Sequence, residues 1–345
     1  MNPLIWSLLI TGLSTGTIIT MSSYHWLLAW LGLELNTLSI LPIISKSHHP
    51  RATEAATKYF LIQAMAAALI MSASTLNAWQ TGHWSITNTT NTATTTMITL
   101  ALLFKLGAAP MYAWYPEILQ GSTLMTAMIL TTWQKLAPMT LLYMISPHLP
   151  QHLILVTGLL SALTGGWSGL NQTQTRKIMA FSSIAHMGWL IIALHLSPAL
   201  TTMTLLIYII MTLTVFLAFN TMTIKTLTDM GLAWSQSPSL MTMIMISIMS
   251  LGGLPPLTGF MPKWLILNDL CQKNLIPLSV LLATASLPSL FFYTRMAYFT
   301  VLTIPPNTTN THFKWRFKPK STYGLTITVT TTLMLLALTP LMITT

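Results

Sequence analysis

Four ionisable residues lie within long apolar stretches of this 345-residue chain: Glu34, Lys105, Lys135 and Lys263. An ionised side chain at the centre of a membrane costs at least ~2.5 kcal/mol, so it is retained chiefly where it has a partner or water and a function. Burial disfavours the charged form of such groups, whereas an opposite charge nearby favours it. Making and breaking these contacts changes proton affinity, which is chemistry suited to moving protons.

Each candidate also has a structural interpretation. Lys135 falls about thirteen residues into its predicted span, roughly 15 to 20 Å from either membrane face, so its stem does not reach the lipid headgroups. Glu34 could form a purely structural salt bridge with a lysine, a contact that proton transfer also requires. His186, in the middle of a span, suits a proton relay or a hydrogen-bonded packing role equally well. Glu117, which follows Trp114-Tyr115-Pro116, is expected to anchor the end of its span.

The composition indicates an integral membrane protein. Charged residues make up 6% and apolar residues 53% of the chain, too few polar side chains to cover a water-soluble globule of this size. The first apolar run begins at Pro3 with no basic segment before it, so we expect no cleavable leader. Cys271 is the single cysteine of the sequence, which excludes an iron–sulfur cluster or an internal disulfide on this chain. The histidines lack the spacing of metal ligands, so we expect no metal site.

Eleven apolar stretches have lengths suited to membrane-spanning helices, mostly about 17 to 25 residues. They are 3–22, 25–44, 58–79, 96–120, 123–145, 153–170, 178–196, 200–224, 240–270, 275–300 and 324–343. Two are expected to be discontinuous, because Pro110 and Pro116 fall inside 96–120, and Pro255, Pro256 and Pro262 inside 240–270. Non-helical backbone in a membrane must be buried in protein or face water, so a broken span commonly lines a transport route; a simple proline kink is the alternative.

The basic residues predict an orientation. With the N-terminus inside, ten of the 15 basic residues fall in inner loops and only Lys273 falls in an outer loop. The inner ones are Lys46, Arg51, Lys58, Arg176, Lys177, Lys225, Lys314, Arg316, Lys318 and Lys320. Arg295 is expected to reach the inner membrane face by snorkelling. The net charge of +10 therefore indicates contact with an anionic membrane surface rather than nucleic-acid binding.

The order of the spans predicts an all-α architecture of two halves and a tail. Residues 1–145 would form a first five-helix half, residues 146–300 a second, inverted five-helix half, and residues 301–345 a basic inner loop and a final transmembrane helix. Because five is odd, the second half starts on the opposite side of the membrane, as in an inverted repeat.

Three sequence runs resemble the antiporter-like membrane subunits of mitochondrial NADH:ubiquinone oxidoreductase, respiratory complex I. They are Met1-Asn2-Pro3, the stretch from Phe104 to Glu117, and the stretch from Gly253 to Trp264 with GLPPLTGF followed by PKW. The resemblance covers essentially the whole chain. It implies a proton-translocating subunit of the membrane arm of an NADH:ubiquinone reductase, driven by quinone reduction elsewhere in the complex. It also implies the mitochondrial inner membrane, with the N-terminus in the matrix and the C-terminus in the intermembrane space.

The resemblance implies roles and partners as well. Carried over by position, Glu34 pairs with Lys105, Lys135 connects to a central polar axis on which His186 lies, and Lys263 leads toward the outer exit. This chain is expected to bind no cofactor, while NADH, FMN, iron–sulfur clusters and ubiquinone bind other subunits. The expected partners are other membrane-arm and accessory subunits and lipids, including anionic inner-membrane lipids. Two alternatives stay open: a free-standing cation/proton antiporter or solute transporter, and a passive scaffold.

Overall fold

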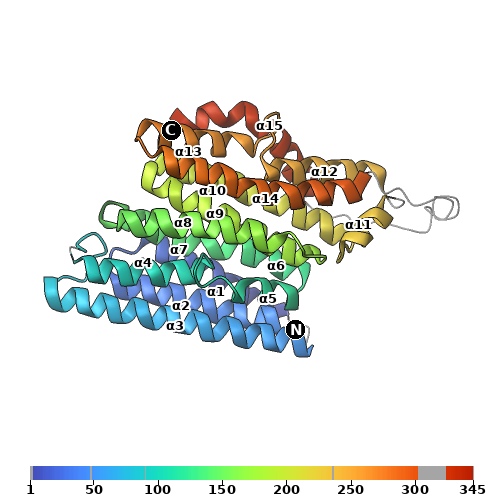
Figure 1. Ribbon diagram of the computed structural model, residues 1–345. Coiled ribbons are helices and arrows are strands. Elements are labelled where there is room, and N and C mark those ends of the chain that lie inside the picture. Colours follow the sequence, from blue (N-terminus) through green and yellow to red (C-terminus); the bar gives the residue numbers. More distant parts are fainter. Residues whose placement is uncertain (1–2, 47–48, 90, 235–236, 302–323, 345) are drawn as a thin grey trace. The chain divides into compact units, whose positions relative to one another are not determined.

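The structure is a computed structural model that describes residues 3–46, 49–89, 91–234, 237–301 and 324–344. Within these ranges the chain is helical and contains two isolated bridges but no β-strand, in agreement with the predicted all-α fold (Figure 1). The α-helices are α1 Pro3–Ser22, α2 Trp26–Ser45, α3 Pro50–Thr81, α4 Thr92–Leu106, α5 Trp114–Gly121, α6 Leu124–Thr131, α7 Leu136–Ile145, α8 Gln151–Gly169, α9 Thr175–Leu196, α10 Pro198–Thr221, α11 Leu227–Ala233, α12 Pro238–Gly252, α13 Phe260–Gln272, α14 Ile276–Val301 and α15 Leu325–Thr344. The predicted basic loop, with Lys314, Arg316, Lys318 and Lys320, lies outside the described residues.

Six of the described helices are long and apolar enough to cross a membrane. They are α1, α2, α3, α9, α10 and residues Ile276–Thr300 of α14. The helices α4 and α12 and residues Leu325–Ala337 of α15 are also apolar but shorter. A helix satisfies its own backbone polar groups, which is what a membrane interior requires of a spanning segment.

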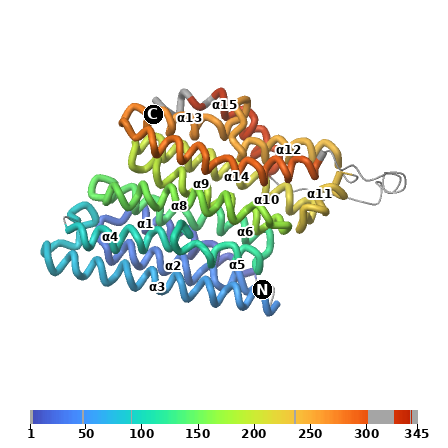
Figure 2. Tube along the Cα trace, in the orientation of Figure 1, coloured from blue at the N-terminus to red at the C-terminus, as the bar shows by residue number. Residues whose placement is uncertain are grey.

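The chain divides into two compact units, Met1–Leu160 and Ser161–Thr345. In the first unit, α3 packs against α2, α4 and α5, and α1 packs against α2 and α7. The helices α2 and α3 pack side by side, as the ribbon and the tube drawn in one orientation both show (Figures 1 and 2). In the second unit, α10 packs against α9, α12 and α15, and α14 packs against α11, α12 and α13. The predicted division into residues 1–145, 146–300 and 301–345 stays a prediction.

Small residues allow close helix crossings within each unit. A Cβ atom at Gly32 of α2 would lie 2.6 Å from Thr20 Cγ2 and 2.9 Å from the carbonyl oxygen of Gly16 on α1. A Cβ atom at Gly165 of α8 would lie 2.5 Å from the amide nitrogen of Ala185 on α9. Membrane helices associate largely through such backbone approach, because lipid tails are as apolar as leucine.

Both discontinuities predicted from the prolines are present. The helix is interrupted between α4 and α5 and again between α12 and α13. Gly107 and Gly253 follow the first member of each pair with φ of 72° and 82°, a left-handed conformation that glycine adopts without a Cβ penalty. Pro116 and Pro262 lie in the first turns of α5 and α13. Backbone N–H groups in a first turn have no acceptor within the helix, so a proline there costs no helical hydrogen bond. The breaks therefore follow from local backbone chemistry.

A third interruption corrects the expectation of one continuous helix over residues 123–145. A 3-10 turn at Trp133–Lys135 separates α6 from α7. Pro138 accounts for the change, because it has no N–H to donate to the carbonyl of Gln134 and its ring crowds that carbonyl. Lys135 thus lies at a helix junction rather than inside a regular helix.

The short helix α11 lies in the stretch 225–239, where the sequence analysis placed only a loop. A capping box starts it: the Asp229 carboxylate accepts hydrogen bonds from the backbone N–H of Thr226 at 2.8 Å and of Lys225 at 3.0 Å. Burial alone would raise the pKa of the Asp229 carboxyl, but these two N–H donors hold it below its usual value. The charged carboxylate therefore stabilises α11.

We expect Asp229→Asn to loosen α11 by removing that charge. A group with a lowered folded-state pKa stabilises above its unfolded pKa, and the contribution is lost as pH falls through the folded pKa. In the wild-type chain, the protection of the α11 amides against hydrogen exchange, measured relative to the intrinsic exchange rate at each pH, should therefore be greater at pH 7 than below about pH 4. The asparagine variant should exchange a few-fold faster at pH 7 and lose this pH dependence. A variant that keeps the wild-type pH dependence would contradict the assignment.

Candidate functional site

Lys105 is buried in the first unit at the C-terminal end of α4, with 7% of its surface exposed. Its Nζ atom is enclosed and has no hydrogen-bond partner. A buried amine without a partner is costly, so the fold retains Lys105 against a free-energy penalty. Such a placement marks a functional candidate more strongly than it marks a structural residue.

Glu34 lies on α2 in the same unit and acts on Lys105 through a Coulombic attraction. The two side chains are not joined by an ion pair within 4.0 Å, and the Oε2 atom of Glu34 is enclosed without a hydrogen-bond partner. Glu34 lines an open groove of about 480 Å³ between α2 and α3, together with Trp30 and Ala67. The carboxylate therefore lies within electrostatic reach of the amine but outside hydrogen-bonding distance of it.

Lys135 shares a cavity with Lys105 and is 2% exposed. The cavity has a volume of about 20 Å³, close to the ~10 to 15 Å³ of accessible space that one water molecule needs. Its polar lining includes Gln63, Gln134 and Tyr59. The site can thus accommodate a water molecule with several hydrogen-bonding neighbours.

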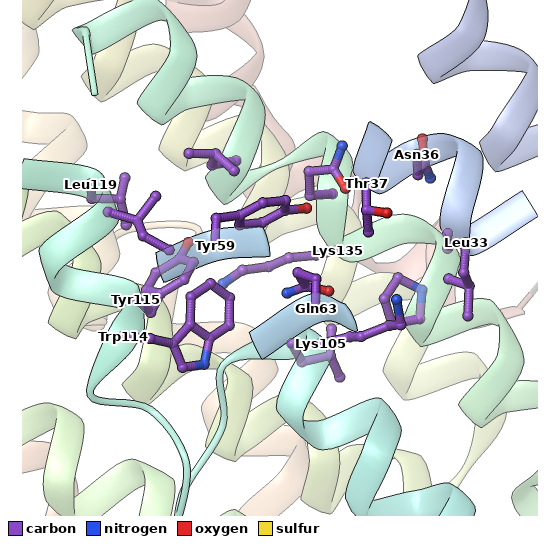
Figure 3. A pocket seen from close by; sticks show the side chains of 16 residues that line it. Leu33, Asn36, Thr37, Tyr59, Gln63, Lys105, Trp114, Tyr115, Leu119 and Lys135 are labelled. Carbon is purple, nitrogen blue, oxygen red and sulfur yellow. The ribbon is translucent and has the colours of Figure 1, made fainter. Parts of the chain in front are cut away.

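Aromatic rings form one wall of this cavity. The Nζ atom of Lys135 lies 5.2 Å from the centroid of the Tyr115 ring, and Figure 3 shows the lysine stem extending toward that ring. The face of an aromatic ring attracts a cation, so the wall favours a charged lysine without supplying a carboxylate. Tyr59 and Tyr115 were missed by the sequence analysis, although a phenol inside an apolar span is a detectable anomaly.

Lys263 occupies the first turn of α13, next to the second break. Its Nζ atom donates a 2.9 Å hydrogen bond to the carbonyl oxygen of Gly252, the last residue of α12, and lies 6.0 Å from the centroid of the Trp189 ring. The interruption of the helix frees this carbonyl, because no N–H four residues later continues the ladder. The lysine therefore links the two ends of the broken span.

His186 lines a second cavity of about 20 Å³ with Lys263, Tyr208 and Met211. Its Nε2 atom lies 3.3 Å from the Tyr293 hydroxyl, and its ring centroid lies 5.6 Å from that of Tyr208. The hydrogen-bonded environment fits both interpretations of His186 that the sequence left open. The structure thus brings His186 and Lys263 into one cavity, and Lys105 and Lys135 into another.

Two further charged residues considered in the sequence analysis, Glu117 and Arg295, have structural partners. Glu117 on α5 forms an ion pair with Lys58 on α3, with 2.6 Å between Glu117 Oε2 and Lys58 Nζ. The same Nζ atom lies 2.5 Å from Oε1 of Glu54. The contact between Lys58 and Glu117 anchors the end of the first broken span, as expected, although an exposed ion pair contributes only about 0 to 1 kcal/mol. Arg295 donates a 2.8 Å hydrogen bond to the carbonyl oxygen of Leu170 beyond the end of α8, and its snorkelling to the inner membrane face stays a prediction. Among the described residues, no group of three His, Cys, Asp or Glu side chains could hold a metal ion.

Comparison with protein families defines the class of this chain. A family model described as "NADH:quinone oxidoreductase/Mrp antiporter, TM" matches residues 23–288. A second, "NADH dehydrogenase subunit 2 C-terminus", matches residues 290–343. Together they cover both broken spans and every candidate residue, so the fold and the cavities belong to an antiporter-like membrane subunit.

Full-length relatives identify the family within this class of membrane subunits. The chain is 48% identical over 345 residues to NADH-ubiquinone oxidoreductase chain 2 of Xenopus laevis, covering 100% of both chains. It is 49% identical over 344 residues to the protein of the same name from Coturnix japonica, covering 100% of this chain and 99% of the relative. The chain belongs to the NADH-ubiquinone oxidoreductase chain 2 family, which confirms the resemblance seen in the sequence.

Solved structures agree on the fold. A chain of respiratory complex I from Thermus thermophilus superposes with a TM-score of 0.86 at 25% identity, covering 97% of this chain and 77% of that chain. A chain of the Mrp complex from Dietzia sp. superposes with a TM-score of 0.84 at 14% identity, covering 97% of this chain and 75% of that one. The second likeness concerns the fold alone.

Proposed function

We propose that this chain translocates protons as a core membrane-arm subunit of an NADH:ubiquinone oxidoreductase. One observation carries the proposal: Lys105 and Lys135, both buried, line a single cavity with room for about one water molecule. Two amines that share a water can exchange a proton over a short distance without crossing apolar protein. A passive scaffold has no need for this arrangement, which is costly to bury.

The proposed relay uses Glu34, Lys105, Lys135, His186 and Lys263. A carboxylate that approaches Lys105 favours the ammonium form, and its withdrawal favours the neutral amine, so the ammonium releases its proton to the shared water. Lys135 accepts that proton, and His186 and Lys263 perform the corresponding transfer in the second unit. Lys263 then passes the proton toward the outer side. Each proton moved against a membrane potential costs ~2.3 kcal/mol per 100 mV, so the energy must be supplied by quinone reduction in other subunits.

The proposal includes the setting of the chain. It lies in the mitochondrial inner membrane with the N-terminus in the matrix and the C-terminus in the intermembrane space, crossing eleven times in two inverted five-helix halves and a final helix. The distribution of basic residues and the two lysine-bearing breaks support this topology. NADH, FMN, iron–sulfur clusters and ubiquinone bind other subunits. Those subunits, accessory subunits and anionic lipids are its partners.

The decisive experiment replaces Lys135 by methionine, which keeps the stem length but cannot carry a proton. The variant is assembled into the complex, reconstituted in vesicles, and assayed for protons pumped per NADH oxidised. We expect this ratio to fall, or coupled turnover to fall several-fold, with unchanged assembly on native gels. An unaltered ratio and rate would favour the scaffold.

A free-standing cation/proton antiporter is the second candidate, favoured by the fold shared with the Mrp complex chain. It predicts sodium-dependent proton flux by the isolated chain in vesicles. The proposed function predicts that such flux is absent without the other subunits.

A further inference from the structure

Tyr293 on α14 contacts both functional elements of the second unit. Its hydroxyl lies 3.3 Å from His186 Nε2 on α9. Its ring faces the end of α12, because a Cβ atom at Gly252 would lie 3.6 Å from Tyr293 Cβ and Cδ2. Gly252 is the residue whose carbonyl holds Lys263. Tyr293 therefore lies between the histidine and the anchor of the lysine.

The Tyr293 side chain is fully buried, with 1% of its surface exposed. Ser182, one turn before His186 on α9, is buried as well, and its hydroxyl donates to the backbone carbonyl of Met179 at 2.8 Å. The hydrogen bond between Tyr293 and His186 is therefore made away from solvent.

A phenol is suited to a partner that changes charge. A hydroxyl donates one hydrogen bond and accepts others, whereas a carbonyl only accepts and an amide N–H only donates. Tyr293 can donate to Nε2 when His186 is neutral and accept from the Nε2–H group when the ring is protonated. The buried Nε2 atom of His186 therefore has a hydrogen-bond partner in both protonation states. A buried nitrogen without a partner would cost free energy.

We propose that Tyr293 is a positioning residue that supports both protonation states of His186 and steadies the Gly252 carbonyl to which Lys263 is anchored. The inference rests on the proposed function, since it assigns a task within that relay. The other titratable groups around His186 are Tyr208 on α10 and Lys263 on α13, which line the same cavity. Phe292 packs against the Tyr293 ring with centroids 4.5 Å apart and keeps the ring in place when the hydroxyl is removed.

The test is Tyr293→Phe in the assembled complex, which removes the hydroxyl and keeps the ring. A hydrogen bond to a charged group is stronger than one to a neutral group, so its loss disfavours protonated His186 more than neutral His186. We expect the acidic limb of the pH profile of proton pumping to move to lower pH by about half a unit to one unit. We also expect coupled turnover at neutral pH to fall roughly fivefold to tenfold. Tyr298→Phe is the matched control, because it removes an exposed hydroxyl from the same helix and should change neither quantity.

Two further variants separate positioning from simple destabilisation. In a His186→Asn background, where the relay lacks its histidine and the readout is the remaining rate of NADH oxidation, Tyr293→Phe should cause no further loss, because the residue acts through the histidine. Tyr293→Met, whose flexible side chain fills the space without a hydroxyl, should move the profile in the same direction, and it provides the test if Tyr293→Phe does not assemble.

An unchanged pH profile and pumping ratio in Tyr293→Phe, or in Tyr293→Met where that variant replaces it, overturns the inference. An equal loss of the NADH oxidation rate on Tyr293→Phe with and without His186 overturns it as well. If Lys105→Met, Lys135→Met and Lys263→Met still abolish pumping in the same membranes, only the role of Tyr293 fails. If those three variants pump normally, the proposed function fails with it.

Discussion

Replacing Gly259 by alanine should prevent this chain from folding around its second break. An added Cβ atom at Gly259 would lie 1.8 Å from the carbonyl oxygen of Ser250 and 2.9 Å from its carbonyl carbon. These are backbone atoms of α12, so no side-chain rotation relieves the overlap. Overpacking of a core typically costs about 1 to 3 kcal/mol, and we expect this substitution to reach or exceed the upper end.

The measurement is the amount of assembled complex on native gels and its thermal midpoint. Gly252→Ala is the matched control at the other end of the same break, because its new Cβ atom would meet nothing closer than 3.6 Å. We expect little or no Gly259→Ala complex and near-normal amounts of Gly252→Ala complex. Equal assembly of the two variants would show that the close approach of Gly259 to Ser250 is not required.

The breaks could be predicted from sequence because their causes are local. Proline lacks an N–H, and Gly107 and Gly253 end helices in a conformation that other residues avoid, so each effect acts within one turn of the chain. The 3-10 turn at Lys135 has the same kind of cause in Pro138. It escaped prediction because one proline near a junction does not distinguish a kink from a change of helix type.

The partners of the buried groups could not be predicted in the same way. Tyr293 meets His186 from 107 positions away, and Lys58 meets Glu117 from 59 positions away, separations that no helical periodicity encodes. Glu34 illustrates the limit most clearly. Its position in the middle of α2 follows from hydropathy, but its direction, toward a groove beside α3 rather than into the cavity of Lys105, depends on how α2, α3 and α4 pack.

The resemblance of the chain to its family predicted the class of protein, which helical periodicity could not predict. It correctly assigned the chain to an antiporter-like membrane subunit from the runs around Lys105 and Lys263. These runs combine a lysine with the glycines and prolines that break its helix, so a short sequence encodes both a charge and the irregular backbone beside it. The transfer roles of the individual residues stay predictions that mutagenesis must test.

The sharpest of these tests asks whether Lys105 must release its proton or only carry charge. Arginine stays protonated at any relevant pH, whereas a lysine amine can become neutral. If Lys105 transfers protons, Lys105→Arg should lose coupled turnover by at least about tenfold, as completely as Lys105→Met. If the residue only balances the charge of Glu34, arginine should preserve activity while methionine does not.

Lys46→Arg is the control for the lysine-to-arginine change, because Lys46 lies at the end of α2 with its Nζ atom 4.3 Å from the Trp6 ring centroid, away from the cavity. It should pump normally. The larger guanidinium could disturb packing near Lys105, so the thermal midpoint of the Lys105→Arg complex must match that of the wild type for the comparison to hold. A stable Lys105→Arg complex that pumps at the wild-type ratio would rule out deprotonation of this residue as a step of the relay. It would leave electrostatic attraction to Glu34 as the reason that a cation is buried at the end of α4.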